Sequence, residues 1–542
     1  MDTSSAQLSC LSILSPPLRS QPSHSTPQSS KGKFNTPPLS SPRLPPRRIP
    51  NVMPRGLRAS RRTVVLVALI LAVLLGLHLT DLSPLPAWTS PPQRPGLLLR
   101  PLEGVEPGSP PCRHLASTED IVVVMRTGAT EIQDKLPVHL NTTMRCYPDT
   151  LLFSDYAEAF AGREVYDALS IVDDHTKETN ADFVHYQRLR VIGREGLGRE
   201  ELHAEVYESG PVGKTENPGW RLDKWKFLPI IVRSVELRPT AQWFVFVEPD
   251  TFLVWSNVVQ WLQTLDPARA AYFGSEVQIG EDVFAHGGSA FVLSAPAMRK
   301  VAELYTSDPA EWHTRTAGHW AGDCILGTAL AHAGVPFSWA WPLFQGGSPA
   351  DMDWAESKEG RRLWCAPALA YHHVAAREVE ALWAFEQRHI LAMLAGRPGA
   401  AATVLRGGET VLRHRDVFRR YVVPDLVERR VDWTNMSPDL VEHSARKIAT
   451  VDVRLEECQA ICEARKACVQ YAVSPIGCST SDQVKMGRAS EGLWAETDWV
   501  GYDLTWVIYS YLDEQPFLWI IVLVSGRDRD GRSAPTVRGS LE

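Results

Sequence analysis

The chain lacks an excess of positive charge, which argues against nucleic acid as a partner. Its 542 residues contain 56 Lys and Arg against 63 Asp and Glu, so the formal net charge is −7 at pH 7. Hydrophobic residues make up 44% of the chain and charged residues 22%. A chain of this length and composition can bury a large core and hold two or three domains.

Acidic residues are almost absent from residues 1–62. Asp2 is the only one there, against ten Lys and Arg, and Pro and Ser are frequent. A segment of this composition cannot bury enough apolar surface to offset the conformational entropy that folding costs. We therefore expect residues 1–62 to form a disordered tail.

Charge is missing altogether from residues 63–79, which read TVVLVALILAVLLGLHL. A helix of this length crosses about 30 Å of hydrocarbon. A cleaved signal peptide is the alternative, but the basic lead is too long and no convincing small-residue cleavage site follows. Arg58, Arg61 and Arg62 precede the stretch and Asp81 follows it. By the positive-inside rule, residues 63–79 form the signal anchor of a single-pass type II membrane protein, whose bulk is luminal or extracellular.

Two features agree with this orientation. The glycosylation sequons at Asn141 and Asn435 both lie beyond the apolar stretch. Only Cys10 precedes it, which leaves an even set of eight cysteines for an oxidising compartment, where disulfides are expected and a buried free thiol is the alternative for any one of them. The candidates, whose pairing the sequence leaves open, are Cys112, Cys146, Cys324, Cys365, Cys458, Cys462, Cys468 and Cys478.

Beyond the anchor, residues 80–111 are rich in Pro, Ser and Leu without periodicity and are expected to form an extended stem. Apolar runs at 121–125, 150–153, 243–247 and 290–293 then alternate with helical patterns. The helix predicted over 223–237 leads into one of these runs, and Ser256 and Ser294 are expected to cap later helices. The alternation predicts an α/β domain over 112–430 with a mainly parallel sheet covered by helices on both faces.

Cysteines are dense between residues 431 and 512, at the spacing Cys458-x3-Cys462-x5-Cys468-x9-Cys478. This predicts a small disulfide-linked module. A zinc site is the weaker alternative, because no His stands at a ligand-like spacing among these cysteines. The tail at 513–542 carries no functional signal.

The run WFVFV at 243–247 ends at Glu248-Pro249-Asp250. This pattern indicates a central parallel strand, which would place two carboxylates at the edge of the sheet where α/β proteins bind ligands. Two such oxygen ligands suit Mg²⁺ or Mn²⁺, which in turn suits a diphosphate. An ordinary turn at the end of a strand is the alternative.

Three further segments could carry chemistry. Gly287 and Gly288 precede a strand. Because glycine has no Cβ, the backbone could approach a ligand closely here, or the pair could form an ordinary turn. Asp323 stands at the start of a predicted helix, as a functional carboxylate or as a cap. His372 and His373 offer imidazoles, which are metal-binding or structural.

In this order, the segments resemble glycosyltransferase family 31, close to the core 1 β1,3-galactosyltransferases and the fringe proteins, and especially to their fungal relatives. The resemblance covers residues 112–390. Its motifs are Arg145-Cys146 followed by LLFSD at 151–155, Glu248-Pro-Asp250-Thr, the GGSAFVLS segment at Gly287, and Asp323-x3-Gly327. The family implies a GT-A (Rossmann-like) fold and a Golgi type II membrane enzyme with a luminal catalytic domain. It also implies inverting, metal-dependent transfer of a hexose or N-acetylhexosamine from a UDP-sugar to a glycan or glycoprotein acceptor, β1,3-linked, with Mn²⁺ or another divalent cation.

The resemblance also assigns roles. Asp250 and Glu248 would hold the metal together with one of His372 and His373, and Asp323 would be the catalytic base. The donor would be bound by Thr127, Asp155, Gly287 and Gly288, with Thr127 and Asp155 at the uridine.

The chain departs from the family pattern at two positions. Glu248 stands where the family has Asp, and Gly322 where relatives have a second acid. If Asp323 is only a cap, the chain would be a noncatalytic, membrane-anchored carbohydrate-binding protein with a degenerate transferase domain. The cysteine-rich module resembles a PAN or apple module, which binds carbohydrate or protein.

Overall fold

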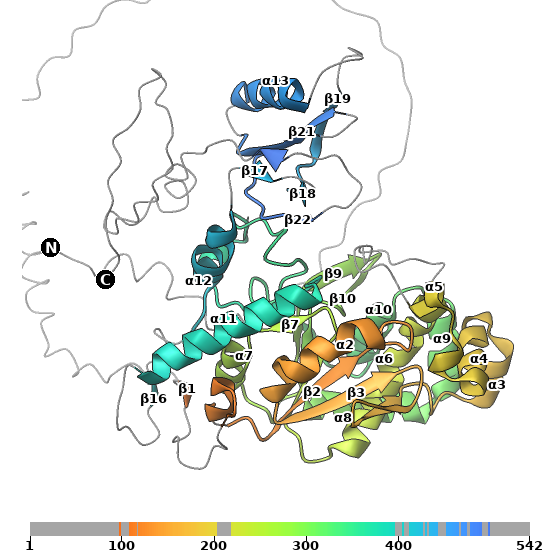
Figure 1. Ribbon diagram of the computed structural model, residues 1–542. Helices are drawn as coiled ribbons and strands as arrows, with labels where there is room; N and C mark the ends of the chain where they lie inside the picture. Colours follow the sequence, from red (N-terminus) through yellow and green to blue (C-terminus); the bar gives the residue numbers. More distant parts are fainter. Residues whose placement is uncertain are drawn as a thin grey trace, which may run out of the picture. The chain divides into compact units, whose positions relative to one another are not determined.

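Three buried parallel strands form the centre of the fold in the computed structural model (Figure 1). Strand β2 (Ile121–Arg126) lies between β6 (Trp243–Val247) and β3 (Asp149–Ser154) and is parallel to both. All residues of β2 and β6 are buried. Continuous β-branched and aromatic runs form such strands because both faces of the sheet are covered. The predicted strands at 121–125, 150–153 and 243–247 are confirmed.

The structure describes residues 97–98, 108–115, 117–202, 218–395, 404–405, 411–426, 429–430, 433–442, 451–465, 468–473, 477–489 and 497–498. The predicted tail at 1–62, the signal anchor at 63–79, most of the stem at 80–111 and the tail at 513–542 lie outside these residues. Within the described ranges, no helix is both long and apolar enough to cross a membrane.

The central strands belong to an eight-stranded sheet with the order β12-β8-β11-β6-β2-β3-β5-β4. Its outer members are β12 (Phe337–Trp339), β8 (Tyr272–Gly274), β11 (Phe291–Ser294), β5 (Arg163–Asp167) and β4 (Glu158–Phe160). The α/β class is confirmed, but the sheet is mixed: β11 is antiparallel to both β6 and β8, and β4 is antiparallel to β5. The sheet is nonetheless mainly parallel, as predicted: four of its seven strand pairings are parallel, and only β11, the predicted strand at 290–293, and β4 run opposite to the other six strands. The chain passes from β8 to β11 through the hairpin of β9 (Glu276–Ile279) and β10 (Asp282–Ala285). Because no crossover helix returns it to the other end of the sheet, β11 runs antiparallel to β8.

Alternate side chains of the central strands enter two separate cores. Ile121, Val123 and Met125 lie in one core, and Val122 and Val124 in the other. The first core is covered by α2 (Ile132–Asn141), α7 (Trp255–Leu262) and α11 (Ala376–Ala395), and the second by α6 (Pro218–Leu237), α8 (Ala295–Ser307) and α10 (Gly322–His332). The prediction of helices on both faces is confirmed, including the helix over 223–237. The other α-helices described before residue 430 are α3 (Asp174–Thr179), α4 (Val184–Ile192), α5 (Arg199–Leu202), α9 (Pro309–Ala317) and α12 (His414–Val417).

A short two-stranded sheet lies next to the end of β6. Strand β7 (Phe252–Leu253) pairs antiparallel with β15 (Ala370–Tyr371), with Phe252 opposite Tyr371. Both strands are buried, and Phe252 and Tyr371 belong to a third hydrophobic cluster, which includes Trp354 and Phe418. This pairing joins parts of the chain that are more than a hundred residues apart.

The two predicted helix caps have different outcomes. Ser294 is the N-cap of α8 and accepts a hydrogen bond from the Ala297 amide, as predicted. Ser256 is not a cap, because α7 begins at Trp255 and Ser256 lies inside its first turn. Its amide and hydroxyl instead both donate to the buried carboxylate of Glu386, at 2.8 and 2.7 Å. The Glu386 side chain, from α11, thus accepts hydrogen bonds from the first turn of α7, whose amides have no partner within the helix.

Six of the eight candidate cysteines pair as Cys112–Cys146, Cys458–Cys478 and Cys462–Cys468. Cys365 also takes part in a disulfide. Cys324 does not, so its prediction as a disulfide partner is wrong. Its side chain is 1% exposed and packs with Phe284 and Ala321 beneath the first turn of α10, where burial raises the pKa of its thiol to about 11.

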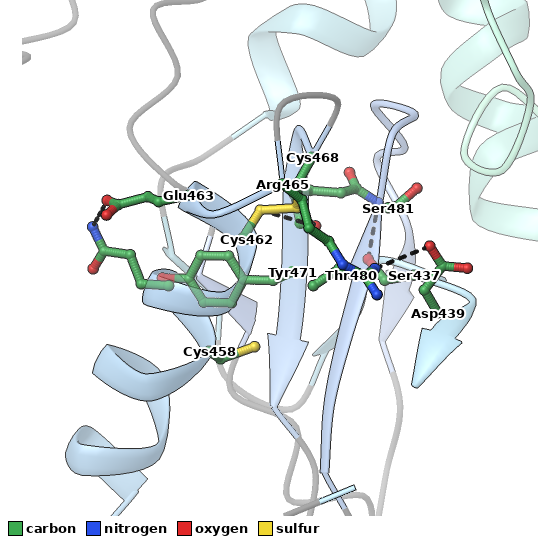
Figure 2. The surroundings of a disulfide bond; sticks show 12 residues. Ser437, Asp439, Cys458, Cys462, Glu463, Arg465, Cys468, Tyr471, Thr480 and Ser481 are labelled. Carbon is green, nitrogen blue, oxygen red and sulfur yellow. Dashed lines mark hydrogen bonds and ion pairs between the residues drawn. A yellow bond between two sulfur atoms is a disulfide. The ribbon is translucent and has the colours of Figure 1, made fainter. Parts of the chain in front are cut away.

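Among its described residues, the cysteine-rich region contains a three-stranded antiparallel sheet and a helix. Strands β19 (Asp439–Glu442), β21 (Gly477–Ser481) and β20 (Gln470–Val473) are antiparallel, and α13 (Val451–Glu463) carries Cys458 and Cys462. Figure 2 shows the Cys462–Cys468 disulfide beside Arg465, whose guanidinium donates to Thr480 at 2.5 Å and to Asp439 at 3.3 Å. The prediction of a disulfide-linked unit here is confirmed.

Candidate functional site

The carboxyl ends of the three central strands meet at one edge of the sheet, where β2 is followed by Thr127, β3 by Asp155 and β6 by Glu248. The turn after β6 is held on two sides. Thr251 donates its hydroxyl to the Gly288 carbonyl at 2.7 Å, and the ring of His139 lies 2.6 Å from the Pro249 carbonyl. His139 is fully buried in α2. The Glu248-Pro249-Asp250 turn is therefore fixed by neighbours that are distant in sequence.

Asp250, His372 and His373 form one group, in which a ligand atom from each residue lies within 4.8 Å of the others. The β7–β15 pairing explains this convergence, because it places residues that follow Tyr371 beside those that precede Phe252. The Val374 amide donates to the Asp250 carbonyl at 2.9 Å and fixes the same register. The structure brings together three of the four residues that the sequence suggested as metal ligands.

The atoms of this group suit a divalent cation. Asp250 Oδ1, His372 Nδ1 and His373 Nδ1 are buried and have no hydrogen-bond partner. His372 Nε2 lies 3.4 Å from Asp250 Oδ1. Buried polar atoms without partners are costly, and a bound cation would satisfy a carboxylate and two imidazoles together. Mixed nitrogen and oxygen donors favour Mn²⁺, Fe²⁺ or Zn²⁺ over Mg²⁺ and Ca²⁺, which prefer oxygen alone.

Lys135 of α2 balances part of the charge of Asp250. Its ammonium lies 3.6 Å from Asp250 Oδ2 and 2.9 Å from Glu131 Oε2. Burial alone would lower the pKa of Lys135 and raise that of Asp250. The attraction of Glu131 and Asp250 outweighs burial and raises the pKa of Lys135, while Lys135 and His372 hold the pKa of Asp250 well below its usual range. Asp250 is thus kept ionised, as a metal ligand must be.

Glu248 lies beside this group but faces a second one. One of its oxygens accepts a hydrogen bond from the Arg126 guanidinium, and the other lies 4.0 Å from His372 Nε2. Arg126 also donates to Asp223 at 2.8 Å and lies 3.7 Å above the Phe227 ring. The group of converging ligand atoms does not include Glu248. The resemblance assigned Glu248 to the metal, whereas the structure joins it to Arg126.

Neighbouring side chains leave no room for a Cβ on Gly288 and little room for one on Gly287. A Cβ on Gly288 would lie 2.2 Å from His372 Nε2, so no other residue fits without moving that ring. A Cβ on Gly287 would lie 3.1 Å from Phe227 and 3.3 Å from Arg126. The predicted close approach is present, but the groups approached are the site's own side chains.

Asp323 is connected to the same loop. It lies in the first turn of α10 and is partly buried, with Oδ2 accepting from the Gly287 amide and Oδ1 from the Cys324 amide, both at 2.9 Å. The N-cap position is Ala321, so Asp323 is not the cap residue. A Cβ on Gly322 would lie 2.4 Å from Phe227 and 2.5 Å from the Lys224 Cα, and this crowding excludes the second acid of the family 31 pattern at this position.

Thr127 and Asp155 lie at the same edge, but both are buried. The Thr127 hydroxyl donates to Glu131 at 3.2 Å. Asp155 Oδ1 accepts from the Ala129 amide at 2.7 Å, while Oδ2 has no hydrogen bond and lies 3.8 Å from Lys226 Nζ. Asp155 Oδ2 is therefore enclosed beside Lys226 and has no hydrogen-bond partner.

The two sequons differ in accessibility. Asn141 is exposed at the end of α2, as a glycan acceptor must be. Asn435 is 0% exposed, and its amide nitrogen donates to the Tyr471 carbonyl at 2.8 Å. The structure argues against a glycan on Asn435, because the nitrogen that would carry it is enclosed.

Arg126, Lys135, His139 and Asp223 were not proposed as site residues from the sequence. Arg126 ends a buried strand, and that position was the one available signal. Nothing in the sequence linked the other three to the turn at Asp250.

No protein-family model matches the chain, and no curated protein matches it either. The likeness to family 31 thus stays a resemblance, and function has to be inferred from the side chains that meet at this edge.

Proposed function

We propose that this protein is an inverting, metal-dependent glycosyltransferase of the family 31 type, with a GT-A architecture. It would transfer a hexose or N-acetylhexosamine from a UDP-sugar to a hydroxyl group of a glycan or glycoprotein. The observation that carries the proposal is the convergence of Asp250, His372 and His373 at the carboxyl edge of the central strands. This group lies against Gly288, and the amide of the neighbouring Gly287 binds Asp323. Open α/β sheets bind ligands at this edge.

Asp250, His372 and His373 would hold the cation. When bound, Mn²⁺ or a similar ion neutralises a diphosphate and assists its departure as a Lewis acid. Lys135 and His139 support Asp250 by charge and by fixing the turn, respectively. Carboxylates outnumber Lys and Arg in the contacts of this edge, which favours a cation there over an anion alone.

Asp323 would act as the base. Inversion requires one displacement, in which the acceptor oxygen bonds to the anomeric carbon, the bond to the diphosphate breaks, and the hydroxyl proton passes to a carboxylate. Two backbone amides orient the carboxylate of Asp323, and the side chain is only partly buried, so its oxygens can still reach an acceptor. Thr127 and Asp155 would contact the uridine.

The cellular setting belongs to the same proposal. Residues 63–79 would anchor the chain in the Golgi membrane with the catalytic domain in the lumen. The disulfides support an oxidising compartment. The β1,3 linkage rests on the resemblance alone, and the cysteine-rich module would bind carbohydrate or protein near the acceptor.

The test uses purified full-length protein with Mn²⁺ and, separately, UDP-galactose, UDP-glucose and UDP-N-acetylglucosamine. We expect release of UDP from at least one donor, lost in Asp250→Asn and kept in the surface control Glu281→Gln. Binding of carbohydrate without any release of UDP would instead support the rival function, a noncatalytic carbohydrate-binding protein.

A further inference from the structure

His286 is an imidazole at the carboxyl edge of the sheet to which the proposed transfer assigns no role. Its ring packs edge-on against the ring of His372, with centroids 5.3 Å apart and the ring planes at 64°. The next residue is Gly287, whose amide donates to Asp323 at 2.9 Å. Burial and the charge of His372 lower the pKa of His286, and the charges of Asp323 and Glu248 oppose this, so all three groups lie within electrostatic range of the ring. His286 thus lies next to both the metal-binding group and the proposed base.

Two backbone contacts hold the loop that carries His286. The His286 amide donates to the Ser275 carbonyl at 2.8 Å. Two residues later, the Gly288 carbonyl accepts from the Thr251 hydroxyl at 2.7 Å. Since Thr251 directly follows Asp250, these contacts fix the position of the loop relative to the metal-binding group.

A hydrogen bond to Ser289 decides which ring nitrogen of His286 carries a proton. His286 Nδ1 lies 2.7 Å from Ser289 Oγ. The Ser289 side chain is buried, and its hydroxyl has no other partner in the part of the chain that the structure describes. Because a buried hydroxyl proton without an acceptor is costly, the hydroxyl donates to Nδ1. Nε2 then carries the proton of the neutral ring, and it carries one in the charged ring as well.

The Nε2 atom of His286 is open to a ligand. The side chain is partly exposed, and no described residue accepts a hydrogen bond from Nε2. Nδ1 of His372 and Nδ1 of His373, by contrast, are enclosed. A protonated nitrogen cannot serve as the base, but a fixed N–H donor beside the metal-binding group suits an anionic oxygen.

We propose that His286 donates a hydrogen bond from Nε2 to the leaving diphosphate, with Ser289 as the residue that positions this proton. The inference rests on the proposed function and adds a second group, besides the cation, that stabilises the leaving charge. In the transfer, the acceptor oxygen bonds to the anomeric carbon while the bond from that carbon to the diphosphate breaks. The electron pair stays on the diphosphate oxygen, and the acceptor proton passes to Asp323. His286 keeps its own proton, and its hydrogen bond strengthens as charge develops on that oxygen.

The test measures binding of UDP to full-length protein with Mn²⁺ by calorimetry. His286→Asn and His286→Gln form a matched pair, because both side chains end in an amide N–H but only glutamine is long enough to place it near the Nε2 position. We expect His286→Asn to weaken UDP binding by about tenfold, the effect of one hydrogen bond to a charged group, and His286→Gln to retain most of the affinity. Binding of uridine, which lacks the diphosphate, should not change. His175→Asn, at an exposed imidazole of α3, is the control and should bind UDP like the wild type.

Two further measurements concern turnover and the role of Ser289. With a sugar donor that the wild type uses, His286→Asn should lower kcat by about 10²-fold, as loss of one such donor does elsewhere. Ser289→Ala should weaken UDP binding and leave uridine binding unchanged. Combined with His286→Asn, it should cause no loss beyond that of His286→Asn alone, because both changes remove the same hydrogen bond.

Mn²⁺ binding without a nucleotide separates this role from metal ligation. His286→Asn and His286→Gln should keep the Mn²⁺ affinity of the wild type, and its loss in both would make His286 a metal ligand and overturn the inference. Equal weakening of uridine and UDP binding would also overturn it. UDP binding by His286→Asn at the wild-type affinity would overturn the inference while leaving the proposed transferase standing. Absence of Mn²⁺-dependent UDP binding in the wild type would overturn both.

Discussion

Replacing Gly288 with alanine should displace His372 from Asp250 and His373. The added Cβ would lie 2.2 Å from His372 Nε2 and 2.3 Å from Cε1. Real Cβ atoms essentially never approach another heavy atom within 3.0 Å, so the ring must move by about 1 Å. His372 is 5% exposed and its backbone follows β15 directly, so the surrounding packing resists that movement.

Two quantities follow from this displacement. Forcing one carbon into a packed site costs about 1–3 kcal/mol of folding free energy. A ligand displaced by about 1 Å is beyond the tolerance of about 0.5 Å for a preorganised site. By comparison with the loss of groups that orient metal ligands, we expect metal affinity to fall by about 10- to 100-fold.

The assay is calorimetric titration of Mn²⁺ and Zn²⁺ into full-length protein, with thermal unfolding at matched metal concentrations. A metal that binds the folded state raises the unfolding temperature, and Gly288→Ala should lose most of that rise. Gly287→Ala, whose Cβ would meet Phe227 and Arg126 at 3.1 and 3.3 Å, should disturb donor binding more than metal binding. Gly318→Ala is the matched control, because its nearest contacts would be an ordinary 3.6 and 3.7 Å. Wild-type metal affinity in Gly288→Ala would refute the assignment of His372 to the metal.

Three further predictions concern the proposed base, the metal ligand and a buried acid. Asp323→Asn should reduce turnover by about 10²- to 10⁴-fold while UDP-sugar binding persists; loss of binding in calorimetry would point to a structural role. Asp250→Asn should abolish metal-dependent UDP binding with an unchanged circular dichroism spectrum, and unaltered turnover would contradict its role as a ligand. Burial raises the pKa of Glu386 from its ordinary 4.5 to about 7, although the hydrogen bonds from Ser256 oppose this. The folded state therefore holds this proton more tightly than the unfolded chain, so stability is fully present below pH 4.5 and falls as the pH rises to about 7, by about 3 kcal/mol. Glu386→Gln should flatten that dependence in urea unfolding at pH 5 and pH 8, and an unchanged slope would show that other groups cause it.

The sequence was sufficient where a feature is local or periodic. The run at 243–247 is continuously apolar and ends at Glu248, so a buried strand that delivers acids to an edge could be predicted. Ser294 could be predicted as a cap because its partner is only three residues away. Four closely spaced cysteines likewise indicated a disulfide-linked unit, since short loops bring such residues together.

Tertiary structure decided every feature that joins distant segments. His372 reaches Asp250 because β15 pairs with β7, and no pattern around either residue encodes that register. Glu248 contacts Arg126 because both lie at the ends of neighbouring parallel strands. Cys324 is buried against Phe284 and Ala321 and forms no disulfide. The sequence by itself determined the central strands β2, β3 and β6 and the polar residues that follow them. Packing determined which of those residues meet, because the contacts between segments more than a hundred residues apart depend on the whole arrangement of the cores.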